Sequence, residues 1–313
     1  MLGQTFDLGK IDRKGRAAWD AVDSKDFRLL VALHENARLS YRSLGQRVSL
    51  SAPAVRERLN RLEARGILQG YWLYIDPNVL DREDLMVFYR GEWRREDALK
   101  ALDVEDVAFV AWKLDGSLSV QVWPRDRAKP IKDLTSALES RPSGQTFTKR
   151  REETQRLSLI DLRIMDALVD YPLTPFEELV KKTGLSPKTV RKRLQLLIID
   201  ETIFIMPRLG SLAEPGDLVY HLTVTGTAGR NELRRVLGEA LVVSETSEPP
   251  LKYLLCRADD LAEVTVRTQA VRKLPGVDSV EVTLNKELLV GKEFVHYLIR
   301  RKIREWERKR ETN

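Results

Sequence analysis

The sequence predicts an α+β protein built from two copies of one composite unit. Its 313 residues suffice for about two such units, and 42% hydrophobic with 32% charged residues is typical of a chain that buries a core. Residues 26–68 align without a gap on residues 161–203, and 12 of the 43 pairs are identical. A similar series of apolar segments follows each copy. The chain is therefore expected to be internally duplicated.

The first copy begins with three predicted helices. Leu29, Leu30 and Leu33 give an apolar face to a helix over residues 23–36. Ser40 and Ser51 are typical N-caps for the second and third helices, because a serine oxygen accepts a hydrogen bond from a free backbone N–H of the first turn.

The third helix has one apolar stripe and one polar face. Val55, Leu59 and Leu62 form the stripe, and Gly66 is typical of the end of a helix. The aromatic-rich segment 67–76 is predicted to be a strand of the kind that forms a wing.

The second copy repeats this pattern. Ser158 is predicted to cap its first helix, residues 174–177 to form a capping box with proline at N1, and Ser186 to cap its third helix. Both copies are therefore candidate helix-turn-helix units, in which a projecting helix enters the DNA major groove. A plain three-helix bundle with a solvated arginine face is the alternative.

The segments after each copy predict a βαββαβ arrangement, with strands and helices in the same order both times. Helices on one face of each antiparallel sheet leave the other face in need of a partner. The predicted elements of the first set are 85–89, 94–102, 107–114, 117–123, 127–139 and 145–149, and those of the second are 218–225, 230–237, 241–246, 251–257, 261–273 and 280–284.

The segments 24–30, 36–40, 50–51 and 55–71 resemble the Lrp/AsnC (feast/famine) transcriptional regulators. The resemblance covers a winged helix-turn-helix domain, and the βαββαβ part is similar to the ferredoxin-like sensing and oligomerisation domain of that family. It implies two such pairs per chain, where one is the family norm. The expected bounds are an extension at 1–22, winged helix-turn-helix domains at 23–78 and 157–208, ferredoxin-like domains at 83–150 and 216–288, and a basic C-terminal helix at 290–313.

The second copy departs from the family pattern at the end of its third helix. Glu201 replaces the family glycine, and Leu196, Ile198 and Ile199 make the helix end apolar nearly all round. We expect that end to be buried against another domain or subunit. The sequence also has no clear form of the family's glycine-and-acid effector loop, so an effector stays unassigned.

The leading functional hypothesis is a sequence-specific DNA-binding transcriptional regulator without catalysis. Arg56 and Asn60 would face base edges, with Ser51, Ala52 and Pro53 at the helix start. The expected phosphate contacts are Tyr41, Arg42, Arg58 and Arg61, although Arg58 has the alternative of an ion pair within its domain. In the second copy, the candidates for DNA contact are Lys188, Thr189, Arg191 and Lys192.

Two other function classes remain open. Tetrapyrrole decarboxylases resemble these regulators and need histidine and arginine groups around a large cavity, and here His221 is the only histidine in a sensing-domain strand. A nonspecific architectural DNA-binding protein would use the basic tail, because residues 292–313 carry eight Lys or Arg against four Glu. We expect no cofactor or metal, since Cys256 is the single cysteine and no phosphate-binding loop motif occurs.

Partners and location follow from the same reading. The expected partners are double-stranded DNA and a second copy of the chain, which would form a homodimer or larger species through the βαββαβ domains. The sequence contains no long apolar run, and residues 1–14 carry charges where a signal peptide needs a continuous apolar stretch. A cytoplasmic protein is therefore expected. The C-terminal helix would dock through Val295, Ile299, Ile303 and Trp306 and leave Arg300, Arg301, Arg304 and Arg308 near solvent.

Overall fold

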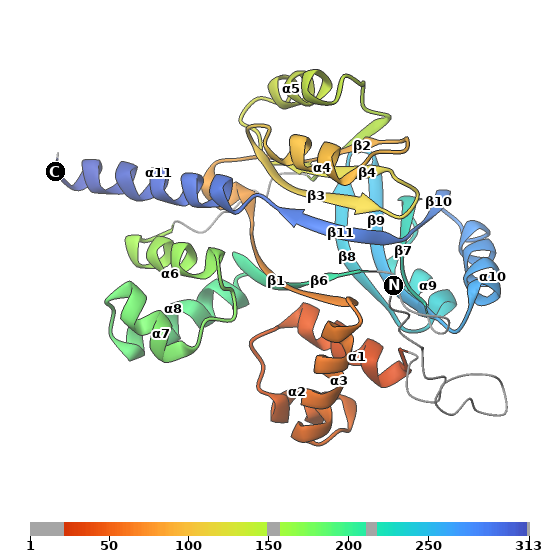
Figure 1. Cartoon of the computed structure of the whole chain (residues 1–313), viewed down its shortest axis with the longest axis horizontal. Coiled ribbons are helices and arrows are strands. Elements are labelled where there is room, and N and C mark those ends of the chain that lie inside the picture. The colour runs from red at the N-terminus through yellow and green to blue at the C-terminus, as the bar shows by residue number, and fades with distance from the viewer. Residues whose placement is uncertain (1–21, 149–156, 211–217, 312–313) are drawn as a thin grey trace, which may run out of the picture.

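The computed structural model describes residues 22–148, 157–210 and 218–311 (Figure 1). Nearly all of the extension expected at 1–22 lies outside these residues. The described elements form two helix-turn-helix units, two antiparallel sheets with helices, a two-stranded ribbon and a long C-terminal helix. The α+β class and the duplicated architecture are as the sequence predicts.

Three helices form the first helix-turn-helix unit. Asp23, Ser40 and Ser51 cap them, and each side chain accepts a hydrogen bond from a backbone N–H three residues on. The two predicted serine caps are therefore confirmed. The helices are α1 (Ser24–Glu35), α2 (Tyr41–Val48) and α3 (Ala52–Ala64).

The second unit repeats the three helices with one difference. Ser158 and Ser186 cap the first and third helices as predicted, but the second helix has Pro175 at its N-cap and no side-chain cap. The predicted capping box at 174–177 is wrong, because the Thr174 hydroxyl donates instead to the carbonyl of Tyr171 at 2.6 Å. The helices are α6 (Leu159–Val169), α7 (Phe176–Thr183) and α8 (Pro187–Ile199).

The strands that follow the two units pair with each other. β1 (Leu68–Ile75) and β6 (Ile203–Leu209) form an antiparallel ribbon between the copies, so β1 is not a wing within its own unit. Gly66 (φ 69°) and Glu201 (φ 52°) occupy equivalent left-handed positions just before these strands. Glutamate at such a position costs about 1 kcal/mol relative to glycine.

Each βαββαβ segment folds into a sheet with ferredoxin-like strand order. The first sheet follows the short 3-10 helix at Pro77–Leu80, and its strands run β3-β4-β2-β5. The second runs β8-β9-β7-β10 in the corresponding order. The elements of the first are β2 (Asp84–Tyr89), α4 (Arg95–Leu102), β3 (Val107–Lys113), β4 (Leu118–Val122), α5 (Ala128–Leu138) and β5 (Gly144–Thr148); those of the second are β7 (Leu218–Gly226), α9 (Arg230–Leu237), β8 (Ala240–Ser247), β9 (Pro250–Ala258), α10 (Leu261–Arg272) and β10 (Val277–Thr283).

An additional strand, β11 (Asn285–Val290), carries the end of the second copy into the first sheet. It pairs with β3, with Leu288 opposite Ala111. This strand was not expected from the sequence, in which the second ferredoxin-like domain was expected to end at residue 288. The edge of the first sheet is therefore completed by a segment from the other copy.

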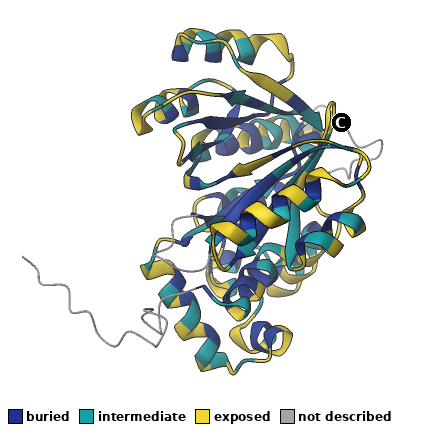
Figure 2. Cartoon of the chain, turned by 90° about the vertical axis from the view of Figure 1, so that its right-hand side faces the viewer, coloured by how far each residue is buried: buried dark blue, intermediate teal, exposed yellow. Residues whose placement is uncertain are grey.

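The faces of the sheets that their own helices do not cover are largely closed within the chain. Lys113 and Gln121 on the first sheet and His221 and Thr283 on the second are all buried. Tyr253 of the second sheet and Asn285 of β11 hydrogen-bond to each other. Figure 2 shows buried residues concentrated in the strands and exposed residues along the outer faces of the helices.

The last helix, α11 (Lys292–Glu311), packs on α6 of the second helix-turn-helix unit (Figure 1). Val295 and Ile299 are buried as expected, and His296 contacts both Asp166 on α6 and Asp170 at its C-cap. Arg301 differs from the expectation: its side chain is 14% exposed and lies 3.5 Å from Glu305.

Candidate nucleic-acid interface

The exposed face of α3 carries the residues predicted to read DNA. Val55, Leu59 and Leu62 are buried in the core, so the opposite side of the helix is left to solvent. No hydrogen bond or ion pair within the described chain engages the side chains of Arg56 or Asn60. Of the other predicted residues, Ala52 is half-buried, and the exposed ones are Tyr41, Arg42, Ser51 and Pro53.

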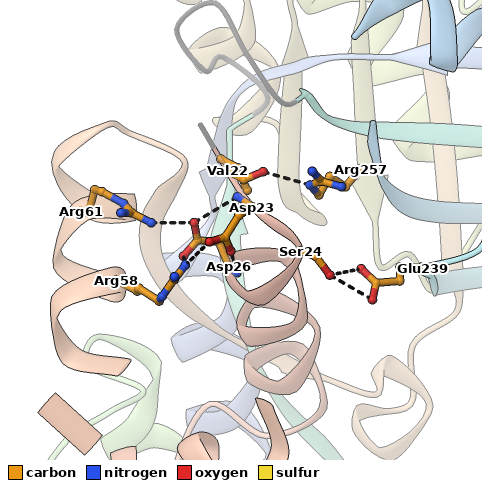
Figure 3. Close-up of polar contacts among 8 residues, drawn as sticks. All are labelled: Val22, Asp23, Ser24, Asp26, Arg58, Arg61, Glu239 and Arg257. Atoms are coloured by element: carbon orange, nitrogen blue, oxygen red, sulfur yellow. Dashed lines mark hydrogen bonds and ion pairs between the residues drawn. The ribbon is translucent and has the colours of Figure 1, made fainter. Parts of the chain in front are cut away.

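Arg58 and Arg61 lie on a different side of α3, where they form an ion-pair cluster (Figure 3). Arg58 Nη1 lies 2.6 Å from Asp23 Oδ2 and 2.8 Å from Asp26 Oδ1, and Arg61 Nη2 lies 2.7 Å from Asp26 Oδ2. Both guanidinium groups therefore hold α3 against α1. For Arg58 the structure shows the ion pair within the domain that the sequence offered as the alternative, and Arg61 pairs in the same way, whereas phosphate contact by these two residues stays a prediction.

The cluster also affects ionisation at the start of α1. Burial would raise the pKa of Asp23, but the hydrogen bonds from the Asp26 N–H and from Arg58 outweigh it and hold the pKa below its usual value. Asp23 thus stays charged and serves both as helix cap and as an ion-pair partner.

The second unit reproduces this arrangement. Arg193 Nε lies 2.7 Å from Oδ1 of the fully buried Asp161, which is also bonded to Ser158. These two positions are 135 residues beyond Arg58 and Asp26, and both belong to the identical pairs of the repeat. The repeat was therefore the signal in the sequence that could have revealed the ion pair.

The start of α8 presents most of the predicted contacts of the second unit. Lys188, Arg191 and Lys192 are exposed, and the Arg191 guanidinium lies 5.0 Å from the centroid of the Phe176 ring. Thr189 is half-buried, and its hydroxyl shares a hydrogen bond with Ser186.

The apolar end of α8 is only partly covered. Leu196 and Ile198 are half-buried, as expected, but Ile199 is 63% exposed. Ile199 is thus not covered by another domain of the same chain, and its burial against another subunit stays a prediction.

The first helix-turn-helix unit is fixed to the second copy at two places. Ser24 on α1 donates to Glu239, and Arg257 Nε donates to the carbonyl of Val22 at 2.9 Å (Figure 3). Arg28 on α1 also forms an ion pair with Glu239. On the other side, Arg38 donates to the carbonyls of Pro172 at 2.7 Å and Thr174 at 2.8 Å. These contacts therefore fix the position and orientation of α3 relative to α8.

The structure places His221 away from these surfaces. Its ring stacks on Tyr253 with centroids 4.7 Å apart, and burial lowers its pKa to about 3. The ring is therefore neutral near pH 7, with one N–H, and is not present as an imidazolium there. Among the described residues, no group of three or more His, Cys, Asp or Glu side chains is arranged to hold a metal ion, and no helix is both long and apolar enough to cross a membrane.

Comparisons with known proteins identify the family of the two helix-turn-helix units. Residues 22–63 match the AsnC-type helix-turn-helix domain, and residues 157–200 match a winged helix-turn-helix DNA-binding model. The HTH-type transcriptional regulator Rv2324 of Mycobacterium tuberculosis is 41% identical over 151 residues, which are 45% of this chain and 97% of that protein. The chain belongs to the Lrp/AsnC family. Membership agrees with the resemblance seen in the sequence.

Two further similarities are more distant. The Lrp/AsnC chain is 25% identical to the HTH-type transcriptional regulator LrpB of Bacillus subtilis, over 30% of this chain and 65% of that protein. The crystal structure of the siroheme decarboxylase NirDL aligns with 91% of this chain and all of that chain, with 11% identity and a TM-score of 0.46. That score is too low to support an argument about function.

Proposed function

We propose that this Lrp/AsnC chain is a sequence-specific DNA-binding transcriptional regulator that places α3 in the major groove. The observation that carries the proposal is that the polar side chains of α3 fall into two groups, one ion-paired within the unit and one exposed. Arg58 and Arg61 are tied to α1 by ion pairs, whereas Arg56 and Asn60 are exposed and free of contacts within the described chain. Arginine and asparagine are side chains that form bidentate hydrogen bonds with guanine and adenine.

Phosphate contacts in the first unit are assigned to the start of α2. Tyr41 and Arg42 are exposed at the first turn of α2, beside the polar start of α3. We assign Arg58 and Arg61 a positioning role instead, because they hold α3 in its orientation through Asp26. Lys188, Arg191 and Lys192 are assigned to a second DNA contact through α8, with Thr189 at its helix cap.

A binding-site selection experiment tests the proposal. The double variant Arg56→Ala/Asn60→Ala should fold normally, since neither side chain touches the core, and should lose discrimination among DNA sequences. Each lost base contact is worth about 1 to 3 kcal/mol. Glu57→Ala is a matched control, because Glu57 is exposed on the same helix and has no assigned base contact. Unchanged selectivity of the double variant would refute the assignment of α3.

The same proposal includes a second copy of the chain as partner. The inner sheet faces are already closed within one chain, so the dimer surface must lie elsewhere on the βαββαβ domains. Leu261 and Val266 on α10 are each 66% exposed, and β10 is an edge strand of the second sheet in the described structure. Exposed apolar side chains beside an open edge favour association.

We favour a regulator over an enzyme. The relatives reported above are named as transcriptional regulators, and His221, the residue that an enzymatic alternative would need, is buried and neutral. A nonspecific architectural role is disfavoured by the exposed base-reading pair on α3. A protein with this function acts where DNA is, so we also propose a cytoplasmic location.

A further inference from the structure

A cavity of about 530 Å³ lies where the two copies meet near α7. Tyr71 of β1 contributes from the first copy, while the α6–α7 loop, Arg208 of β6 and Lys292 at the start of α11 contribute from the second. Its volume is within the range of about 300 to 1,000 Å³ that is usual for small-molecule sites. None of the residues assigned to DNA contact lines it.

The lining residues include two carboxylates and two cations. The two carboxylates, Asp170 and Glu178, are already engaged, the first with His296 at 3.2 Å and the second with Lys182 at 3.0 Å. The two cations, Arg208 and Lys292, have no carboxylate within ion-pair distance among the described residues. The cavity is therefore suited to an anion.

The cations are held by neutral groups. Lys292 Nζ donates to the backbone carbonyl of Asp170 at 3.0 Å, and Arg208 donates to the backbone carbonyls of Gln69 and Leu288. A Cβ at Gly70 would come within 3.1 Å of Arg208 Nη2, so glycine there lets the guanidinium lie against β1. Burial lowers the pKa of Arg208, although the charge of Glu287 opposes this shift.

An aromatic surface borders these cations. The Tyr171 side chain is 68% exposed, and Lys182 and Lys292 lie 5.4 and 5.9 Å from its ring centroid. A planar ring can stack on such an exposed aromatic side chain. An inorganic anion would leave this surface and most of the cavity unused.

We propose that this cavity binds a small organic anion, with its carboxylate or phosphate group between Arg208 and Lys292 and its planar apolar part against Tyr171. The ligand contacts both copies of the unit. The site does not depend on the proposed DNA-binding function, because occupancy is measured without DNA.

The test uses 2-naphthoate as the probe and neutral 2-naphthamide as its matched ligand, with binding to the full chain followed by fluorescence anisotropy. Naphthoate should bind at least about tenfold more tightly, since a charge-assisted hydrogen bond is worth about 1.5 to 3 kcal/mol. Lys292→Gln should remove most of that difference without changing naphthamide binding. Arg208→Gln should do the same, and Lys292→Gln serves as the readout if the Arg208 variant fails to fold.

Two further variants separate the parts of the proposed site. Tyr171→Ala should weaken naphthoate and naphthamide equally, and Lys132→Gln, an exposed lysine on α5, should change neither. Equal binding of the two ligands by the natural chain would overturn the proposal, as would naphthoate binding that Lys292→Gln leaves unchanged. Inorganic phosphate that competes as tightly as naphthoate, or duplex DNA that displaces it, would assign the cations to phosphate alone and overturn the organic ligand.

Discussion

Arg58 Nη1 lies 2.8 Å from Oδ1 of Asp26, a carboxylate with no exposed surface. The other carboxylate oxygen of Asp26 accepts from Arg61, and the capping box at the start of α1 uses the same side chain. In the second unit, Asp161 and Arg193 form the same pair. Each third helix is thus anchored to its first helix through one buried aspartate.

The anchor should contribute measurably to stability. Asp26→Asn removes the negative charge that faces two guanidinium groups, so we expect the free energy of unfolding to fall by about 2 kcal/mol. Glu35→Gln is the control on the same helix, because its ion pair with Arg47 is exposed and worth less than about 1 kcal/mol. Denaturant unfolding followed by circular dichroism measures both. Equal losses would contradict the anchoring role.

The start of α8 should add to DNA affinity without selecting sequence. Lys188→Gln/Lys192→Gln removes two exposed cations, so the slope of log affinity against log salt should flatten by about 1.8 if both contact phosphates. Lys132→Gln/Arg141→Gln removes the same charge from exposed positions around α5 and serves as control. Identical slopes for both double variants would mean that only the first unit contacts DNA.

The C-terminal helix offers a comparable test with less risk to folding than a deletion. Arg304 and Arg308 are exposed, whereas Val295 and Ile299 pack against the second unit. Arg304→Gln/Arg308→Gln should flatten the salt slope by about two if α11 lies on DNA. An unchanged slope would make α11 a packing helix, and the loss of oligomer on deleting residues 300–313 would then identify it as an assembly element.

Because its carboxyl is buried, Asp84 should make the folded state less stable as the pH rises, which is the reverse of the usual effect of an aspartate. Burial raises its pKa to about 6, although Gln121, Thr148 and Tyr74 donate hydrogen bonds to it. The folded state thus favours the protonated carboxyl. Its stabilising contribution is complete below about pH 4 and is lost as the pH rises through about 6.

The measurement compares the natural chain with Asp84→Asn between pH 4 and pH 7. The natural chain should lose up to about 3 kcal/mol more than the variant over this interval. Asp76→Asn is a useful comparison, because that carboxylate lies nearby and contributes to the raised pKa of Asp84. If the two curves run parallel for Asp84→Asn, the carboxyl has an ordinary pKa.

Association should depend on α10. Leu261→Glu/Val266→Glu places charge on two exposed apolar positions, so light scattering should show the chain at its monomer mass of 36.0 kDa while the natural chain is larger. Lys132→Glu on α5, the counterpart of α10 in the first sheet, should leave the assembly intact. A natural chain that is already monomeric at micromolar concentration would refute the proposed dimer.

Local sequence patterns predicted most of the helices and strands. They did not predict which strands pair with each other across large separations in the chain. Ser40, Ser51, Ser158 and Ser186 cap helices as expected, because capping is decided by a side chain and the backbone three residues away. The pairing of β1 with β6 and of β11 with β3 joins residues far apart in the chain. An alternating apolar pattern identifies a strand but does not select its neighbour.

The sequence predicted which helix carries the candidate DNA-contacting residues, but not which of the polar side chains on that helix are engaged in ion pairs. The apolar stripe of α3 fixed which side faces solvent, so Arg56 and Asn60 are exposed as expected. Arg58 and Arg61 could not be separated from them by helix periodicity alone, since their roles depend on Asp26 from another helix. The cavity near Arg208 was not foreseen, because its lining comes from four separate segments of the chain.

The hydrogen bonds from Arg38 to the loop at Pro172 join two helix-turn-helix units whose exposed third-helix side chains differ. A symmetric pair of identical subunits presents the same surface twice and therefore suits a palindromic target. Here Pro53 and Asn60 of α3 correspond to Lys188 and Gln195 of α8. On the proposed function, each chain has a polarity along the duplex, so the segment of DNA that one chain contacts need not be palindromic, even where a symmetric dimer places two such segments in opposite orientations.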